Sequence, residues 1–115
     1  MSKRSTQDVK LGCTTGDQIF AIDNYASDFY QLDASSDSVL TGTLTVIYSV
    51  PGIDRMKVLK DSTGSPITIN LADPNLLTIT GLHFDKIGVR PTVVVTGGTY
   101  DLSLTTEADG DSNRV

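Results

Sequence analysis

The segment Tyr100-Asp101-Leu102-Ser103-Leu104-Thr105 alternates apolar and polar residues with a period of two. Successive side chains of a β-strand point to opposite faces of a sheet, so this segment buries one face and leaves the other in water. The same alternation recurs upstream, in Thr43-Leu44-Thr45-Val46, Ile67-Thr68-Ile69-Asn70-Leu71 and Leu77-Thr78-Ile79-Thr80. Glycine, proline and aspartate interrupt the pattern about every eight to twelve residues, which is typical of an antiparallel all-β domain.

Turn residues divide the chain into nine predicted strand segments. They span residues 18–22, 29–32, 39–50, 55–60, 66–71, 76–80, 86–90, 93–96 and 99–106. Gly42 predicts a bulge or bend within its strand. Pro91, which has no backbone N–H, either ends a strand or marks a sheet edge. Gly97-Gly98 separates two alternating runs and predicts a hairpin with a primed turn.

These segments predict an all-β, single-domain antiparallel β-sandwich with either jelly-roll or immunoglobulin-like topology. At 115 residues the chain holds one domain and buries a core without covalent cross-links. An antibody-type domain is excluded because the chain has one cysteine and no tryptophan. The predicted boundaries are a polar N-terminal arm over 1–10, the sandwich over 11–106 and an acidic tail over 107–115, with both ends flexible.

The inward face of each predicted strand defines a core. Its predicted members are Leu44, Val46, Tyr48, Ile67, Ile69, Leu77, Ile79, Ile87, Val89, Leu102 and Leu104.

The charge of the chain restricts its partners. The formal net charge is −5, and no cluster of lysine and arginine is present, which argues against nucleic acid as a partner. No apolar run approaches the ~18 residues that would span a bilayer, and no apolar segment follows Met1 as in a signal peptide, so no membrane partner is expected. The lone Cys13 cannot form an internal disulfide and is compatible with a reducing compartment.

Candidate catalytic and metal-binding patterns do not survive comparison with the chemistry they would need. His83 is the only histidine and has no patterned nucleophile beside it, and Cys13 has no basic neighbour. Residues 109–113 space oxygen ligands like the start of a calcium loop but lack its glutamate and its helices. Gly12–Asp17 has no lysine for a phosphate loop, and the aspartates occupy turn positions instead of forming acid and base pairs. The sequence therefore predicts no enzyme, no cofactor and no metal.

Two functional classes remain open. The basic arm, with Lys3, Arg4 and Lys10, contrasts with an acidic body and predicts contacts between subunits. The alternative is a carbohydrate-binding or host-attachment module that uses exposed aromatic side chains. Its candidate residues are Tyr25, Tyr30, Tyr48 and Tyr100.

About half of the chain resembles small structural proteins of tailed-phage virions. The resemblance rests on Phe84-Asp85-Lys86-Ile87-Gly88-Val89-Arg90-Pro91 followed by Val93-Val94-Val95-Thr96-Gly97-Gly98-Thr99-Tyr100-Asp101-Leu102, and on residues 56–67. It implies a capsid decoration (cement) protein or a related particle accessory that binds the major capsid protein or other virion proteins. It also implies a homotrimer, location in the virion after assembly in the host cytoplasm, and a role for the exposed Arg90 at an interface.

Overall fold

The computed structural model describes residues 3–12, 16–22, 28–53, 55–74 and 76–108, and these residues form two antiparallel sheets without a helix. None of the described residues lies in a helix that could cross a membrane. The strands are β1 (Lys3–Leu11), β2 (Gln18–Ala21), β3 (Phe29–Ser35), β4 (Thr41–Ser49), β5 (Lys57–Val58), β6 (Thr68–Asn70), β7 (Leu77–Thr80), β8 (Lys86–Thr96) and β9 (Tyr100–Ala108). The predicted all-β sandwich is confirmed.

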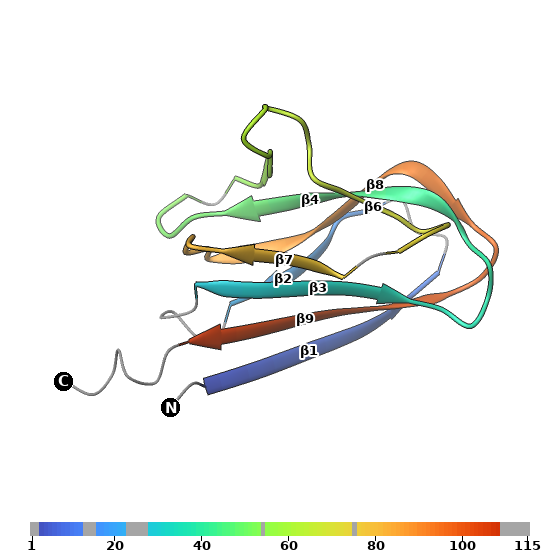
Figure 1. Cartoon of the computed structure of the whole chain (residues 1–115), viewed down its shortest axis with the longest axis horizontal. Helices are drawn as coiled ribbons and strands as arrows, with labels where there is room; N and C mark the ends of the chain where they lie inside the picture. The colour runs from blue at the N-terminus through green and yellow to red at the C-terminus, as the bar shows by residue number, and fades with distance from the viewer. Residues whose placement is uncertain (1–2, 13–15, 23–27, 54, 75, 109–115) are drawn as a thin grey trace.

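The strand order identifies the topology as a jelly roll. The first sheet has the order β1-β9-β3-β7, and β1, β9 and β3 lie side by side in Figure 1. The second sheet has the order β2-β8-β4-β5, and β6 also pairs with β4. Consecutive strands mostly lie in different sheets, so the chain repeatedly crosses from one layer to the other. This arrangement is that of the double-sheet jelly roll and resolves the choice that the sequence left open.

The predicted core is confirmed. Of its eleven members, Tyr48, Ile67 and Leu77 are partly buried and pack against the core, and the other eight are buried. The core also contains residues that were not predicted, including Leu32, Tyr30 and Tyr100. The period-two pattern therefore assigned the inward face of each strand correctly.

The prediction of an N-terminal arm over 1–10 is wrong for residues 3–10. They belong to β1, which pairs with β9 from Lys3 opposite Ala108 to Leu11 opposite Tyr100. Val9 and Leu11 pack against the core, which explains why this polar segment is a strand. At the other end, Glu107 and Ala108 belong to β9 instead of a tail, and residues 109–115 lie outside the described part of the chain.

The prediction of a hairpin at Gly97-Gly98 is also wrong. β8 pairs with β2 and β4, whereas β9 pairs with β1 and β3, so the two glycines carry the chain from one sheet to the other. Their φ angles are 108° and 141°, away from the values of about 60° and 90° that a type I′ turn requires. A side chain at position 97 would collide with the carbonyl oxygen of Val39, so glycine permits a close crossing past the loop before β4.

Irregular pairing between β4 and β8 confirms the predicted bulge near Gly42. The register shifts between Thr41 and Thr43 and again between Thr43 and Leu44. A Cβ on Gly42 would lie 2.9 Å from the carbonyl oxygen of Val94.

Pro91 does not end its strand, because β8 continues through it. It lies beyond Val89, the last residue of β8 that pairs with β2. Of the two alternatives for Pro91, the sheet edge is therefore the correct one.

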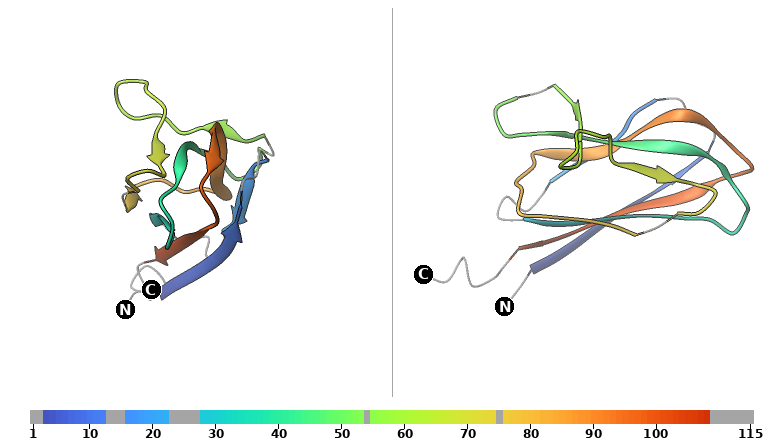
Figure 2. Two further views of the ribbon diagram at one scale, coloured as in Figure 1. Left: turned by 90° about the vertical axis from the view of Figure 1, so that its right-hand side faces the viewer. Right: turned by 45° about the horizontal axis from the view of Figure 1, so that its top comes forward.

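β5 and β6 occupy the same edge of β4. Val58 lies opposite Ile47, and Thr68 lies opposite Thr45. Val46, between these two positions of β4, forms a hydrogen bond with the residue that follows β5 and with the residue that precedes β6. The Leu59 N–H donates to the Val46 carbonyl oxygen, and the Val46 N–H donates to the Ile67 carbonyl oxygen, each at 2.9 Å. The intervening residues 60–66 project from the sandwich as a loop (Figure 1 and the left view of Figure 2).

Candidate functional site

The four predicted interface residues do not form one cluster. Lys3, Arg4 and Lys10 all lie on β1 at the edge of the first sheet, whereas Arg90 lies on β8 of the second sheet. The backbone register places Arg4 opposite Glu107 and Lys10 opposite Asp101. The Lys10 Nζ lies 3.6 Å from a carboxylate oxygen of Asp101, and both side chains are mostly exposed. β1 therefore carries three basic residues along one edge of the molecule.

Arg90 forms an ion pair within the chain. Its Nε donates to Oδ1 of Asp17 at 2.9 Å and its Nη2 donates to Oδ2 at 3.0 Å, which is a bidentate geometry. The hydrogen bonds from Arg90 hold the pKa of the Asp17 carboxyl below its ordinary value. The guanidinium thus joins β8 to the segment that leads into β2.

The prediction of exposed tyrosines for carbohydrate binding is wrong at two positions. Tyr30 and Tyr100 are each only 1% exposed and belong to the core. Tyr48 is partly buried, and its ring centroid lies 5.2 Å from that of Phe84. Tyr25 lies outside the described residues. The described tyrosines therefore do not form an exposed aromatic face.

The remaining chemical candidates give no catalytic arrangement that can be built from described residues. Cys13 and residues 109–113 lie outside the described part of the chain. His83 is exposed in the connection between β7 and β8. Within the described ranges, no three histidine, cysteine, aspartate or glutamate side chains lie close enough to hold a metal ion.

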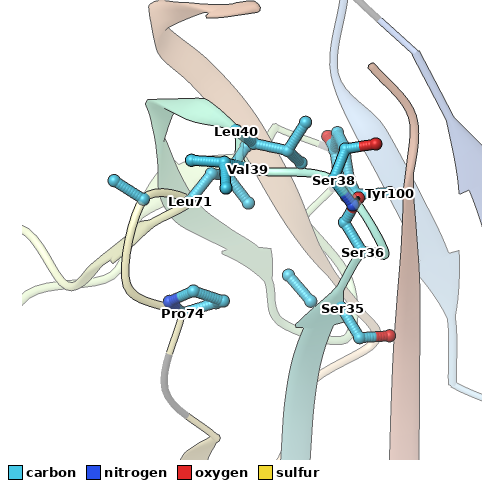
Figure 3. Close-up of a pocket in the computed structure, with 10 residues that line it drawn as sticks. Ser35, Ser36, Ser38, Val39, Leu40, Leu71, Pro74 and Tyr100 are labelled. Atoms are coloured by element: carbon cyan, nitrogen blue, oxygen red, sulfur yellow. Dashed lines mark hydrogen bonds between the residues drawn. The ribbon is translucent and has the colours of Figure 1, made fainter. Parts of the chain in front are cut away.

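A pocket that the sequence reasoning missed opens at one end of the sandwich. Its volume is about 160 Å³, and the loop between β3 and β4, the connection between β6 and β7 and the start of β9 surround it. In Figure 3 the aliphatic side chains of Val39, Leu40, Leu71 and Pro74 lie on one side, and the serines and Tyr100 lie on the other. The available signal was Ser35-Ser36-Asp37-Ser38, which lies between the predicted strands over 29–32 and 39–50.

A second feature missed from the sequence is the exposed apolar part of β8. Val93 and Val94 are 56% and 66% exposed. β2 pairs with β8 only over Lys86–Val89, so residues 90–96 have β4 as their one partner strand in the described part of the chain. Thr92–Thr96 contains no charged residue. The register shifts next to this segment turn neighbouring valines outward together instead of on opposite faces.

Comparison with known proteins shows the fold. No protein-family model matches the chain, and no curated protein matches it in sequence. A solved structure described as "Bacillus endospore appendages form a novel family of disulfide-linked pili" is similar with a TM-score of 0.50 and 13% identity, over 94% of this chain and 89% of that one. The SPBc2 prophage-derived protein YomS is similar with a TM-score of 0.53 and 10% identity, over 89% of this chain and 95% of that one. At such low identity these similarities concern the shared β-sandwich architecture.

Proposed function

We propose that this protein is a non-enzymatic structural subunit that assembles in several copies, in a phage particle or a surface appendage. The observation that carries this proposal is the segment Thr92–Thr96 of β8. It exposes Val93 and Val94 beside each other, carries no charge and has one free strand edge among the described residues. Exposed apolar side chains on an incompletely paired edge are typical of surfaces that another protein covers.

The comparisons support the same class of function. One solved structure with this fold is described as a Bacillus endospore appendage that forms pili, and the other is a prophage-derived protein. Both share most of their length with this chain, so the whole sandwich is the common unit.

The specific form that we propose is a capsid decoration protein. In this form the protein binds the major capsid protein of a phage head as a homotrimer and stabilises the shell in the virion. The edge strand β1 carries the basic residues Lys3, Arg4 and Lys10 in an acidic molecule, and Lys10 pairs with Asp101. Such an edge favours contact with acidic surfaces of neighbouring subunits, including those of other copies of this chain.

Light scattering on the purified protein tests the proposal. We expect a discrete oligomer at micromolar concentration, and a trimeric mass supports the decoration form specifically. Because burying a lysine at an interface is costly, Val93→Lys with Val94→Lys should shift the mass to that of the monomer. Leu82→Lys is the matched control, since Leu82 is also exposed but lies between β7 and β8. A wild-type protein that stays monomeric would contradict the proposal.

A further inference from the structure

The two lips of the pocket at the end of the sandwich carry unpaired carboxylates. Asp37 lies in the loop between β3 and β4, and Asp73 lies in the connection between β6 and β7. In each case both neighbours in the sequence line the pocket. The two aspartates are exposed, and neither forms an ion pair within the described part of the chain. The mouth of the pocket is therefore negatively charged.

Hydrogen bonds hold both lips in place. On one lip the Ser36 Oγ donates to the Thr99 carbonyl oxygen at 2.6 Å and accepts from the Ser38 N–H at 3.1 Å. On the other lip the Asp73 N–H donates to the Asn70 carbonyl oxygen at 3.1 Å. A partner that docks between the lips therefore meets a preformed opening and does not have to order a loop.

The pocket has an aliphatic wall and room for one branched side chain. The wall consists of Val39, Leu40, Leu71 and Pro74 (Figure 3). The volume of about 160 Å³ is close to that of a ~150 Å³ protein cavity that admits benzene, so the four-carbon side chain of an isoleucine fits. An apolar side chain with a cation beside it matches both the wall and the negative mouth.

The connection between β4 and β5 presents this combination at the opposite end of the sandwich. The Ile53 N–H donates to the Val50 carbonyl oxygen at 3.1 Å and closes a turn, and the Ile53 side chain is 44% exposed. Arg55 and Lys57 follow, and both are exposed without an ion pair in the described ranges. Asp54 lies outside the described residues. Residues 53–57 thus carry two cations and one acid.

The pocket and the turn of one copy cannot meet, because β4 separates them. Leu40 of the pocket precedes the first residue of β4, and the turn follows its last residue (Figure 1). A strand of nine residues spans about 30 Å. The turn of one copy can therefore reach only the pocket of another copy.

We propose that residues 53–57 of a second copy dock in this pocket. The side chain of Ile53 packs on the aliphatic wall, and Arg55 lies beside the two carboxylates of the mouth. Each copy then offers one pocket and one turn, so the contact is heterologous and joins copies head to tail in a ring or a filament. This inference rests on the proposed assembly in several copies and adds a second contact to the one on β8.

The strength of the contact follows from its size and charge. Repulsion between two copies of net charge −5 is screened beyond about 8 Å at physiological salt, so the charges at the contact decide. One turn in one pocket is a small interface, and we expect free copies to associate through it only near ~1 mM. In an assembly held together at β8, the effective concentration reaches the millimolar range and the pocket is occupied.

Nuclear magnetic resonance on the full chain with Val93→Lys and Val94→Lys tests the contact apart from the one on β8. We expect the amide signals of residues 35–40 and 71–74 to shift together with those of residues 51–53 and 55–57 as the protein concentration rises from ~0.1 to ~1 mM. Shifts confined to other residues, or no shifts over this range, would overturn the proposal.

Two variants of this protein each break one half of the contact. Ile53→Asp spoils the turn, and Asp37→Lys with Asp73→Lys reverses the charge of the mouth. Neither variant should associate with itself. Labelled Ile53→Asp protein should still show shifts at its pocket when the unlabelled lysine variant, whose turn is intact, is added. Absence of these shifts in the mixture would refute a head-to-tail contact.

Two further variants check the chemistry of the contact. Arg55→Glu changes an exposed side chain, so it should keep the fold while abolishing the concentration-dependent shifts. Leu82→Asp is the matched control, because Leu82 is also exposed and lies near the same end of the sandwich, before β8. It should associate like its parent, and an equal loss in both variants would exclude a specific role for the turn. Light scattering at micromolar concentration reports the contact on β8 alone, so the two proposals can fail independently.

Discussion

The side-chain hydroxyl of Tyr30 accepts a hydrogen bond at 3.0 Å from the backbone N–H of Phe84, 54 residues away in the sequence. Tyr30 lies on β3 in the first sheet, and Phe84 lies two residues before the start of β8 in the second. The two rings also pack with their centroids 4.9 Å apart. This pair therefore joins the two layers of the sandwich by a polar and an apolar contact at once.

Tyr30→Phe should destabilise the protein by about 1 to 3 kcal/mol, because it leaves the N–H of the buried Phe84 without its acceptor. Chemical denaturation followed by fluorescence or circular dichroism measures the change. Tyr100→Phe is the internal control: its hydroxyl has no partner in the described part of the chain, so its removal should not lower the free energy of unfolding. If both variants lose the same stability, the hydrogen bond to Phe84 is not the cause.

Gly88→Ala should destabilise the second sheet by about 1 to 3 kcal/mol, the range for steric overpacking. Gly88 lies on β8 opposite Ile19 of β2, and a Cβ at this position would collide with the carbonyl oxygen of Gln18. The change in the denaturation midpoint reports the effect. At Gly16, by contrast, an added Cβ meets no atom within 4 Å. Gly16→Ala should therefore be nearly neutral, and a loss as large as that of Gly88→Ala would exclude the steric explanation.

Deleting residues 2–10 should unfold or strongly destabilise the domain, because it removes most of β1 and leaves β9 with an open edge. The partly buried Val9 is lost from the core at the same time. The measurement is the thermal transition by circular dichroism. Substituting Lys3 and Arg4 by Gln keeps the strand but removes two charges, so this variant should retain the transition. A truncated protein that melts like the wild type would show that β1 contributes little to the fold.

The ion pair between Asp17 and Arg90 should stabilise the protein fully above about pH 4, the ordinary pKa of an aspartate, and progressively less below it. Hydrogen bonds from Arg90 lower the pKa of Asp17 in the folded state, so the unfolded chain takes up its proton first as the pH falls. The contribution is then lost as the pH falls through the folded pKa. Because the pair is partly exposed, Asp17→Asn should cost about 0.5 to 1 kcal/mol near neutral pH. A difference between the two proteins that persists unchanged in acid would contradict this origin.

The core was predictable from the sequence because burial follows from a local pattern. In a strand with one packed face, each inward residue is separated from the next by a polar one, as in Leu102, Ser103 and Leu104. Residues 3–10 lack this pattern, because Val9 is the only apolar residue among them. A polar edge strand is typical of sheets that avoid aggregation, and it looks like an arm when only the composition is considered.

The pairing of strands and the pocket were not predictable in the same way. Gly97-Gly98 has the composition of a hairpin, yet β8 and β9 enter different sheets because long-range pairing with β4 and β3 determines their places. Tyr100 was a candidate for an exposed aromatic, although the period of two places it on the same inward face of the strand as Leu102 and Leu104. The pocket brings together residues 34–40, 71–74 and 100, which only the jelly-roll topology makes neighbours.

The shared edge of β5 and β6 makes residues 60–67 dispensable for strand pairing. Leu59 already lies beside Val46, and Thr68 lies opposite Thr45, the next residue of β4. Joining Leu59 directly to Thr68 would therefore leave one uninterrupted strand in the same register. By the same reasoning the loop tip, with Ser62 to Gly64 exposed, is a permissive position at which the chain can lengthen, vary or carry a foreign peptide while the sheet stays unchanged.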